Sequence, residues 1–115
     1  MVKAGDELVN PATGLRTIFR ETAQTTGGEL LQVDWIGSPA WTTGPDHIHP
    51  HQEERFEVLS GRLAVQVAGV QNVHGPGEVV VVEAGMSHAA WNAGDTDVHV
   101  LVESHRLEPD DHLVR

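Results

Sequence analysis

The chain has 115 residues, no cysteine and a formal net charge of −10, with seven basic and 17 acidic residues. This length supports one hydrophobic core, and the lack of cysteine excludes disulfides, thiolate metal sites and cysteine nucleophiles. The acidic balance without a basic cluster argues against nucleic-acid binding, because phosphates repel such a surface. No apolar run approaches the roughly 18 residues of a membrane span. The polar first residues indicate no signal peptide, so we expect one cytoplasmic domain over residues 1–115 without membrane contact.

Short segments in which apolar and polar residues alternate run along the chain, separated by turn signals. Residues 31–35, 62–67 and 97–102 show this period of two. The valine-rich residues 78–82 suit a strand that is buried on both faces or lies near the barrel centre. Alternation between closely spaced turns is typical of an antiparallel sandwich or barrel, here with roughly eight to ten strands. No segment has a convincing helical pattern, and the end at 107–115 is expected to be irregular.

Histidine is concentrated in the middle of the chain. His47 and His49 are two positions apart, so on a strand both imidazoles point to the same side. A short turn follows, and Glu54 then begins the next segment with its carboxylate close to the two rings. His88 comes after a second turn at 84–87 and can bring a third imidazole. His51 is expected in the turn, where it could reach the mouth of the pocket, and four histidines are expected at the surface or an interface: His74, His99, His105 and His112.

These segments resemble the two sequence motifs of cupin proteins. Residues 47–61 resemble the first motif, H-x-H-x4-E-x6-G, and residues 77–92 resemble the second, G-x5-P-x-G-x2-H-x3-N. Glu83 replaces the proline of the second motif, and Trp41 stands where a glycine precedes the first, so the loops should differ from the family pattern. The resemblance, to small single-domain bacterial cupins, implies an all-β antiparallel jelly-roll barrel. It also implies one bound divalent metal ion with four ligands, His47, His49, Glu54 and His88.

Three imidazoles and one carboxylate suit Fe, Mn, Ni, Cu or Zn as the divalent transition metal ion. Four protein ligands leave positions free on a six-coordinate metal, which argues against a closed structural site. Glu54 is the candidate catalytic residue, because a carboxylate beside the metal can relay a substrate proton. Strand parity predicts an apolar pocket for a small-molecule ligand or substrate. Its expected lining is Leu31, Val33, Trp35, Phe56, Val58 and Ala90.

Three classes of function fit such a site. We favour an oxygen-dependent dioxygenase acting on a small enol, diketone or aromatic compound. A redox-neutral isomerase, cyclase or decarboxylase would use the same ligands without oxygen, and a non-catalytic cupin would bind only a small molecule or a metal. Fold analogy does not choose among them, because cupins host all three. We also expect a homodimer, because a small barrel exposes sheet edges and residues 15–22 form a natural edge strand near Pro11.

Overall fold

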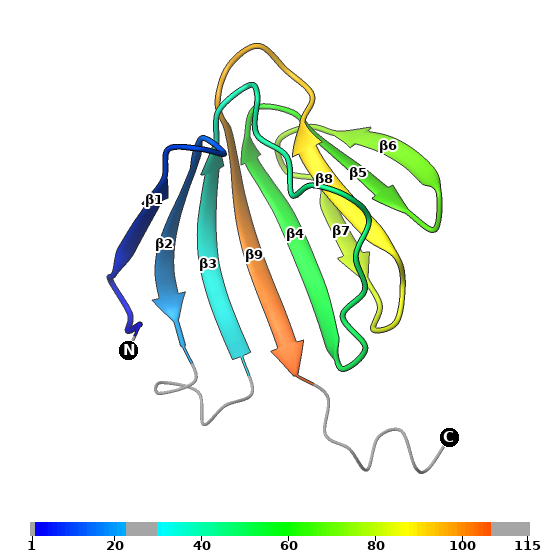
Figure 1. Cartoon of the computed structure of the whole chain (residues 1–115), viewed down its shortest axis with the longest axis horizontal. Helices are drawn as coiled ribbons and strands as arrows, with labels where there is room; N and C mark the ends of the chain where they lie inside the picture. Colours follow the sequence, from blue (N-terminus) through cyan, green and yellow to red (C-terminus); the bar gives the residue numbers. More distant parts are fainter. Residues whose placement is uncertain (1, 23–29, 107–115) are drawn as a thin grey trace.

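The computed structural model describes residues 2–22 and 30–106, and this part of the chain contains nine strands and no helix (Figure 1). The prediction of an all-β antiparallel fold is therefore confirmed, while the expectation for 107–115 lies outside the described residues. Within the described ranges no helix could cross a membrane. The strands are β1 (Glu7–Asn10), β2 (Leu15–Glu21), β3 (Leu30–Gly37), β4 (Gln52–Ser60), β5 (Leu63–Val67), β6 (Val70–His74), β7 (Val79–Val82), β8 (His88–Asn92) and β9 (Val98–Arg106).

The strands form two sheets of the jelly roll. The larger sheet has the order β1-β2-β3-β9-β4-β7, and the smaller has the order β6-β5-β8. Figure 1 shows the larger sheet curving from β1 round to β7, with the smaller sheet on the right. The connection between β3 and β4 crosses to the smaller sheet, where isolated bridges join Thr42 to Trp91 and His47 to His88. This connection therefore extends the free edge of β8 at the place where the predicted ligands lie.

The core lies on the inner face of the larger sheet. Alternate residues of β3, β9 and β4 face inward and are in register, so their apolar side chains form rows across the sheet. Burial of each such side chain contributes about 1.5–3 kcal/mol relative to exposure. Two successive rows, all but Trp35 buried, are Val33–Val102–Phe56 and Trp35–Val100–Val58.

The prediction that residues 78–82 form a strand buried on both faces or near the barrel centre is wrong. β7 pairs only with β4 and forms one edge of the larger sheet. Val79 and Val81 point outward and are 43% and 50% exposed, whereas Val82 points inward and is 1% exposed. The valines reflect a preference for extended backbone, and this preference is the same for a strand with one covered face.

The first strands lie near a sheet edge, as predicted, but the edge strand is not the expected one. β2, which covers most of residues 15–22, pairs with β1 on one side and β3 on the other. Its backbone hydrogen bonds are therefore already used within the chain. β1 forms the edge, and Pro11 follows it directly in the turn. A dimer built by strand pairing at this end would use β1.

Candidate metal centre

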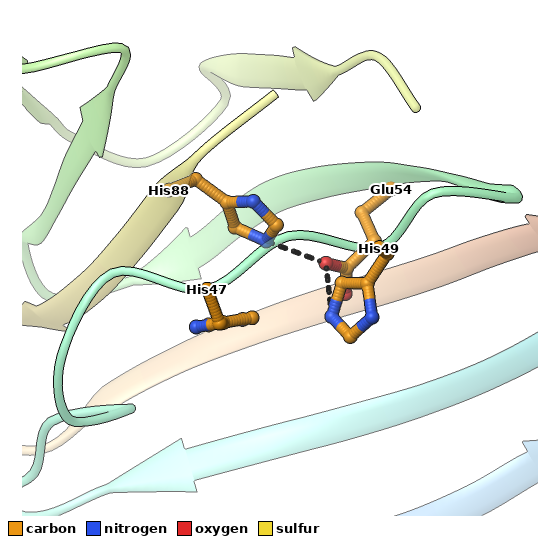
Figure 2. Close-up of side chains that lie close together, drawn as sticks. All are labelled: His47, His49, Glu54 and His88. Carbon is orange, nitrogen blue, oxygen red and sulfur yellow. Dashed lines mark hydrogen bonds and ion pairs between the residues drawn. The ribbon is translucent and has the colours of Figure 1, made fainter. Parts of the chain in front are cut away.

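Four predicted ligands converge between the two sheets. Figure 2 shows His47 and His49 on the connection before β4, Glu54 on β4 and His88 at the start of β8. One donor atom from each side chain lies within 4.8 Å of the others. Glu54 Oε1 is 2.8 Å from His88 Nε2 and 3.3 Å from His49 Nε2. Segments that are more than 30 residues apart in the chain thus build one cluster.

Backbone contacts, and not a regular strand, hold His47 and His49. The connection is irregular around them, which differs from the strand geometry expected from their spacing. The His47 amide donates to the His88 carbonyl and the His88 amide to the His47 carbonyl, both at 2.9 Å. The Gly85 amide donates to the His49 carbonyl at 3.0 Å, and Gly85 has a φ of +84°, which favours glycine. The turn before β8 therefore positions ligands on both segments.

The ring contacts of two histidines fit metal coordination. His47 Nδ1 is 3.3 Å from the Pro45 carbonyl, and His88 Nδ1 is 2.9 Å from the Met86 carbonyl. A carbonyl only accepts, so each Nδ1 donates, and in a neutral imidazole this leaves Nε2 as the nitrogen that can bind a metal. His88 Nε2 faces the carboxylate of Glu54, which is 6% exposed. Ring nitrogens and a carboxylate oxygen directed at one another form a donor set that fits a divalent cation.

An open cleft of about 630 Å³ gives access to this cluster. His47, His49 and Glu54 line it, together with Leu31 and Trp35 from the predicted pocket set. The other four predicted pocket residues are in the buried core and do not line the cleft: Val33, Phe56, Val58 and Ala90. Strand parity identified the face on which they lie but not their depth, because side chains in neighbouring rows fill the space above them.

Several polar residues that line the cleft were not predicted from the sequence. Asp46, Gln52 and Ser104 also line the cleft. Gln52 precedes Glu54 by two positions on β4, and Ser104 is directly opposite Glu54 on β9. Strand parity alone could have identified Gln52, but Ser104 could be identified only from the pairing of β4 with β9. The cleft therefore has one apolar wall and several hydrogen-bonding groups near the ligands.

Trp41, which departs from the family motif, closes the barrel beside the cleft. Its side chain is 2% exposed and contacts Trp35 edge-on, with ring centroids 5.5 Å apart. The ring lies against Gly37, where an added Cβ would be only 2.7 Å from the indole. A residue with a side chain at this position would displace Trp41. Gly37 on β3 thus makes room for the ring of Trp41.

Hydrogen bonds between side chains on the outer face of the smaller sheet hold the connection that carries His47 and His49. Gln66 Nε2 donates to both carboxylate oxygens of Asp46 at 3.0 Å, and Ser87 Oγ donates to Asp46 at 3.4 Å. Gln66 pairs with Ala89, which is 4% exposed and small enough for the amide to reach across it. Asp46 and Ser87 each precede a predicted ligand in the chain. This Asp46–Gln66–Ser87 group therefore holds two ligands in place through their neighbours.

We expect Asp46→Ala to weaken metal binding about tenfold, because outer contacts of this kind orient the ligands. The free energy of unfolding of the metal-free protein should fall by less than about 1 kcal/mol, since the group is exposed. Asp46→Asn keeps one accepting oxygen and should recover part of the affinity. Competition with a chelating dye measures the change. The control is Gln32→Ala, which breaks a side-chain hydrogen bond to Glu103 within the larger sheet. Equal affinity in Asp46→Ala and the native chain would contradict the prediction.

Three further histidines, His74, His99 and His105, lie apart from this cluster. His74 and His105 face partners at Glu78 and Glu103 at 3.5 and 4.0 Å. His99 Nε2 is 3.0 Å from Asp34, which is 1% exposed and also accepts from Arg20. This second ionic group joins β2, β3 and β9 on the outer face of the larger sheet. His112 lies outside the described residues.

Comparisons with known proteins agree with this architecture. Residues 36–103 match the Cupin_2 family model, described as a cupin domain. Oxalate oxidase 1 of Hordeum vulgare is 31% identical over 93 residues, which cover 74% of this chain and 45% of that protein. Germin-like protein 3-3 of Oryza sativa subsp. japonica is 27% identical over 129 residues, covering 92% of this chain and 56% of the relative.

Solved structures show the same fold. A predicted oxalate decarboxylase from Thermotoga maritima superimposes with a TM-score of 0.78 at 20% identity, covering 90% of this chain and 93% of that one. An oxalate oxidase structure gives a TM-score of 0.70 at 26% identity, with 90% and 56% of the two chains covered. The chain spans about half the length of the curated relatives it matches. From its family match, its fold and its two motifs, this chain belongs to the cupin family.

Proposed function

We propose that this cupin is a metalloenzyme that uses dioxygen to oxidise a small organic molecule carrying an enolic, phenolic or carboxylate oxygen. The observation that carries the proposal is the cluster of three imidazoles and one carboxylate at the base of an open cleft. A closed structural site would surround the ion with protein, whereas this arrangement leaves one side open to a substrate. Similarity to a protein named oxalate oxidase supports an oxidative reaction on a small oxyanion.

The four clustered residues would hold the ion through ring nitrogens of His47, His49 and His88 and the carboxylate of Glu54. When bound, a redox-active divalent ion supplies Lewis acidity toward a substrate oxygen and one-electron chemistry with dioxygen.

The protein contributes positioning, exclusion of water and proton transfer. Trp35 and Leu31 form the apolar wall of the cleft and pack against the substrate. Glu54 accepts the proton that an enol or phenol loses on binding, since its carboxylate is buried and lines the cleft.

An oxygen-electrode screen tests this proposal. Protein reconstituted with Fe, Mn, Ni or Cu is offered diketones, flavonols, catechols and oxalate. We expect at least one metal form to consume oxygen as substrate disappears, and Glu54→Gln to lose about a hundredfold or more of that rate. His74→Ala, at a histidine outside the cluster, should keep the native rate. Equal conversion without oxygen would contradict the proposal in favour of a redox-neutral enzyme, and no conversion would favour a binding protein.

A further inference from the structure

A basic residue, Arg106, lies two positions beyond Ser104 on β9, on the same face of the sheet as the candidate ligand Glu54. Glu54 on β4 is paired with Ser104 on β9, and the next inward-facing pair toward the open end is Gln52 with Arg106. Residues two apart on a strand point the same way, so Gln52 and Arg106 share the face of Glu54. Figure 1 shows that β4 begins and β9 ends at the same end of the molecule.

A second hollow beside the cleft confirms this placement of Arg106. Its volume is about 260 Å³, and it is lined by His49, Pro50, His51, Gln52 and Arg106. Two of these residues, His49 and Gln52, also line the larger cleft. The two spaces therefore adjoin at a candidate metal ligand.

Arg106 differs from the arginines of the outer face in having no carboxylate partner among the described residues. Arg16 pairs with Glu7 at 2.7 Å, Arg20 pairs with the buried Asp34, and Arg55 pairs with Glu57 at 3.3 Å. Those guanidinium groups are already engaged. The guanidinium of Arg106 keeps its fork of donors, which matches the two oxygens of a carboxylate.

We propose that Arg106, assisted by the side-chain amide of Gln52, binds a carboxylate of the substrate while another oxygen of the same molecule is at the metal centre. The substrate class is then small dicarboxylates and oxo- or enol-carboxylates. This inference rests on the proposed function, because it names the residues that bind the end of the same substrate that is not at the metal centre. In a chain with a net charge of −10, a local cation favours binding of an anionic substrate.

Calorimetry on the Zn(II)-loaded protein tests the assignment. The probes are oxalate, malonate, succinate and glutarate, each compared with its monomethyl ester, which keeps one carboxylate. In the native chain at least one dicarboxylate should bind more tightly than its ester. Arg106→Met should weaken binding of that dicarboxylate about tenfold and leave the ester unchanged, as expected for an exposed charge-assisted pair. Arg106→Lys should recover part of the loss.

The control is Arg62→Met, the same change of charge in the turn between β4 and β5. Native dicarboxylate affinity in Arg106→Met, an equal loss in Arg62→Met, or no preference of the native chain for any diacid would overturn the assignment. Dicarboxylate binding that depends on Arg106, without oxygen consumption on any substrate, would support the subsite and contradict the proposed oxidative function. Oxidation of a diacid by Arg106→Met at the native KM would support the proposed oxidative function and contradict the subsite.

Discussion

Replacing His88 by alanine is expected to reduce metal affinity by about a hundredfold or more, since a four-ligand site in proteins is worth roughly 10 kcal/mol or more in total. The native chain should carry about one transition metal ion per molecule after gentle purification. His88 contributes one of three ring nitrogens, and its Nε2 lies 2.8 Å from the fourth ligand. Elemental analysis and competition with a chelator give the stoichiometry and the dissociation constant.

Two comparisons make this prediction specific. His74→Ala removes an imidazole outside the cluster and should leave metal content unchanged. His49→Ala changes a ligand that is 38% exposed, so it should lose metal even if the buried change at His88 impairs folding. Circular dichroism of each metal-free variant checks that the barrel is retained. Full metal occupancy in a His47→Ala/His49→Ala double variant would contradict the assignment of the site.

Phe56→Ala is expected to lower the free energy of unfolding by about 3–5 kcal/mol, the usual cost of removing a buried phenylalanine. The Phe56 side chain is 1% exposed and faces Val102 and Val80 on the neighbouring strands. The centroid of its ring is 5.9 Å from that of Trp35. Its removal leaves a cavity directly below Glu54. Urea denaturation of the metal-free protein gives the change in stability, and metal titration should show a weakened site as well.

Val81→Ala is the matched control for the core substitution. Val81 is on the outer face of the edge strand β7 and is 50% exposed, so its truncation should change stability by less than about 0.5 kcal/mol. The two variants remove apolar side chains from the neighbouring strands β4 and β7. Phe56 lies on the inner face of the sheet and Val81 on its outer face. A loss below 1 kcal/mol for Phe56→Ala, or equal losses in both variants, would show that the inner face of β4 is not the core.

The ligand cluster was predictable because its members lie in short motifs. His47, His49 and Glu54 are separated by a few residues, and the glycine-containing turn before His88 is visible in the sequence. The structure brings all four together, although His47 and His49 lie on an irregular connection and not on a strand. Spacing within the motif was enough to group them, because the backbone bonds to β8 and its turn leave the two rings on one side.

The limits of the cleft were not predictable in the same way. Val33 and Phe56 have the parity of pocket residues, but they are buried in the core, in the row between those of Leu31 and Trp35. Arg106 is about 50 residues from the first motif and lies near Glu54 only through the pairing of β9 with β4. Asp46 likewise gains its role from Gln66, on a strand of the other sheet.

The sequence by itself determined the class of fold, the alternation of inward and outward side chains along most strands, and the identity of four candidate ligands. These are properties of local spacing, since residues i and i+2 on a strand share a face whatever the strand's neighbours are. Only the tertiary structure decided that β7 is an edge with Val81 exposed, that β2 is not an edge, and that Arg106 and Ser104 border the candidate metal centre. Strand order depends on hydrogen bonds between segments far apart in the chain, and no local pattern specifies which segments will pair.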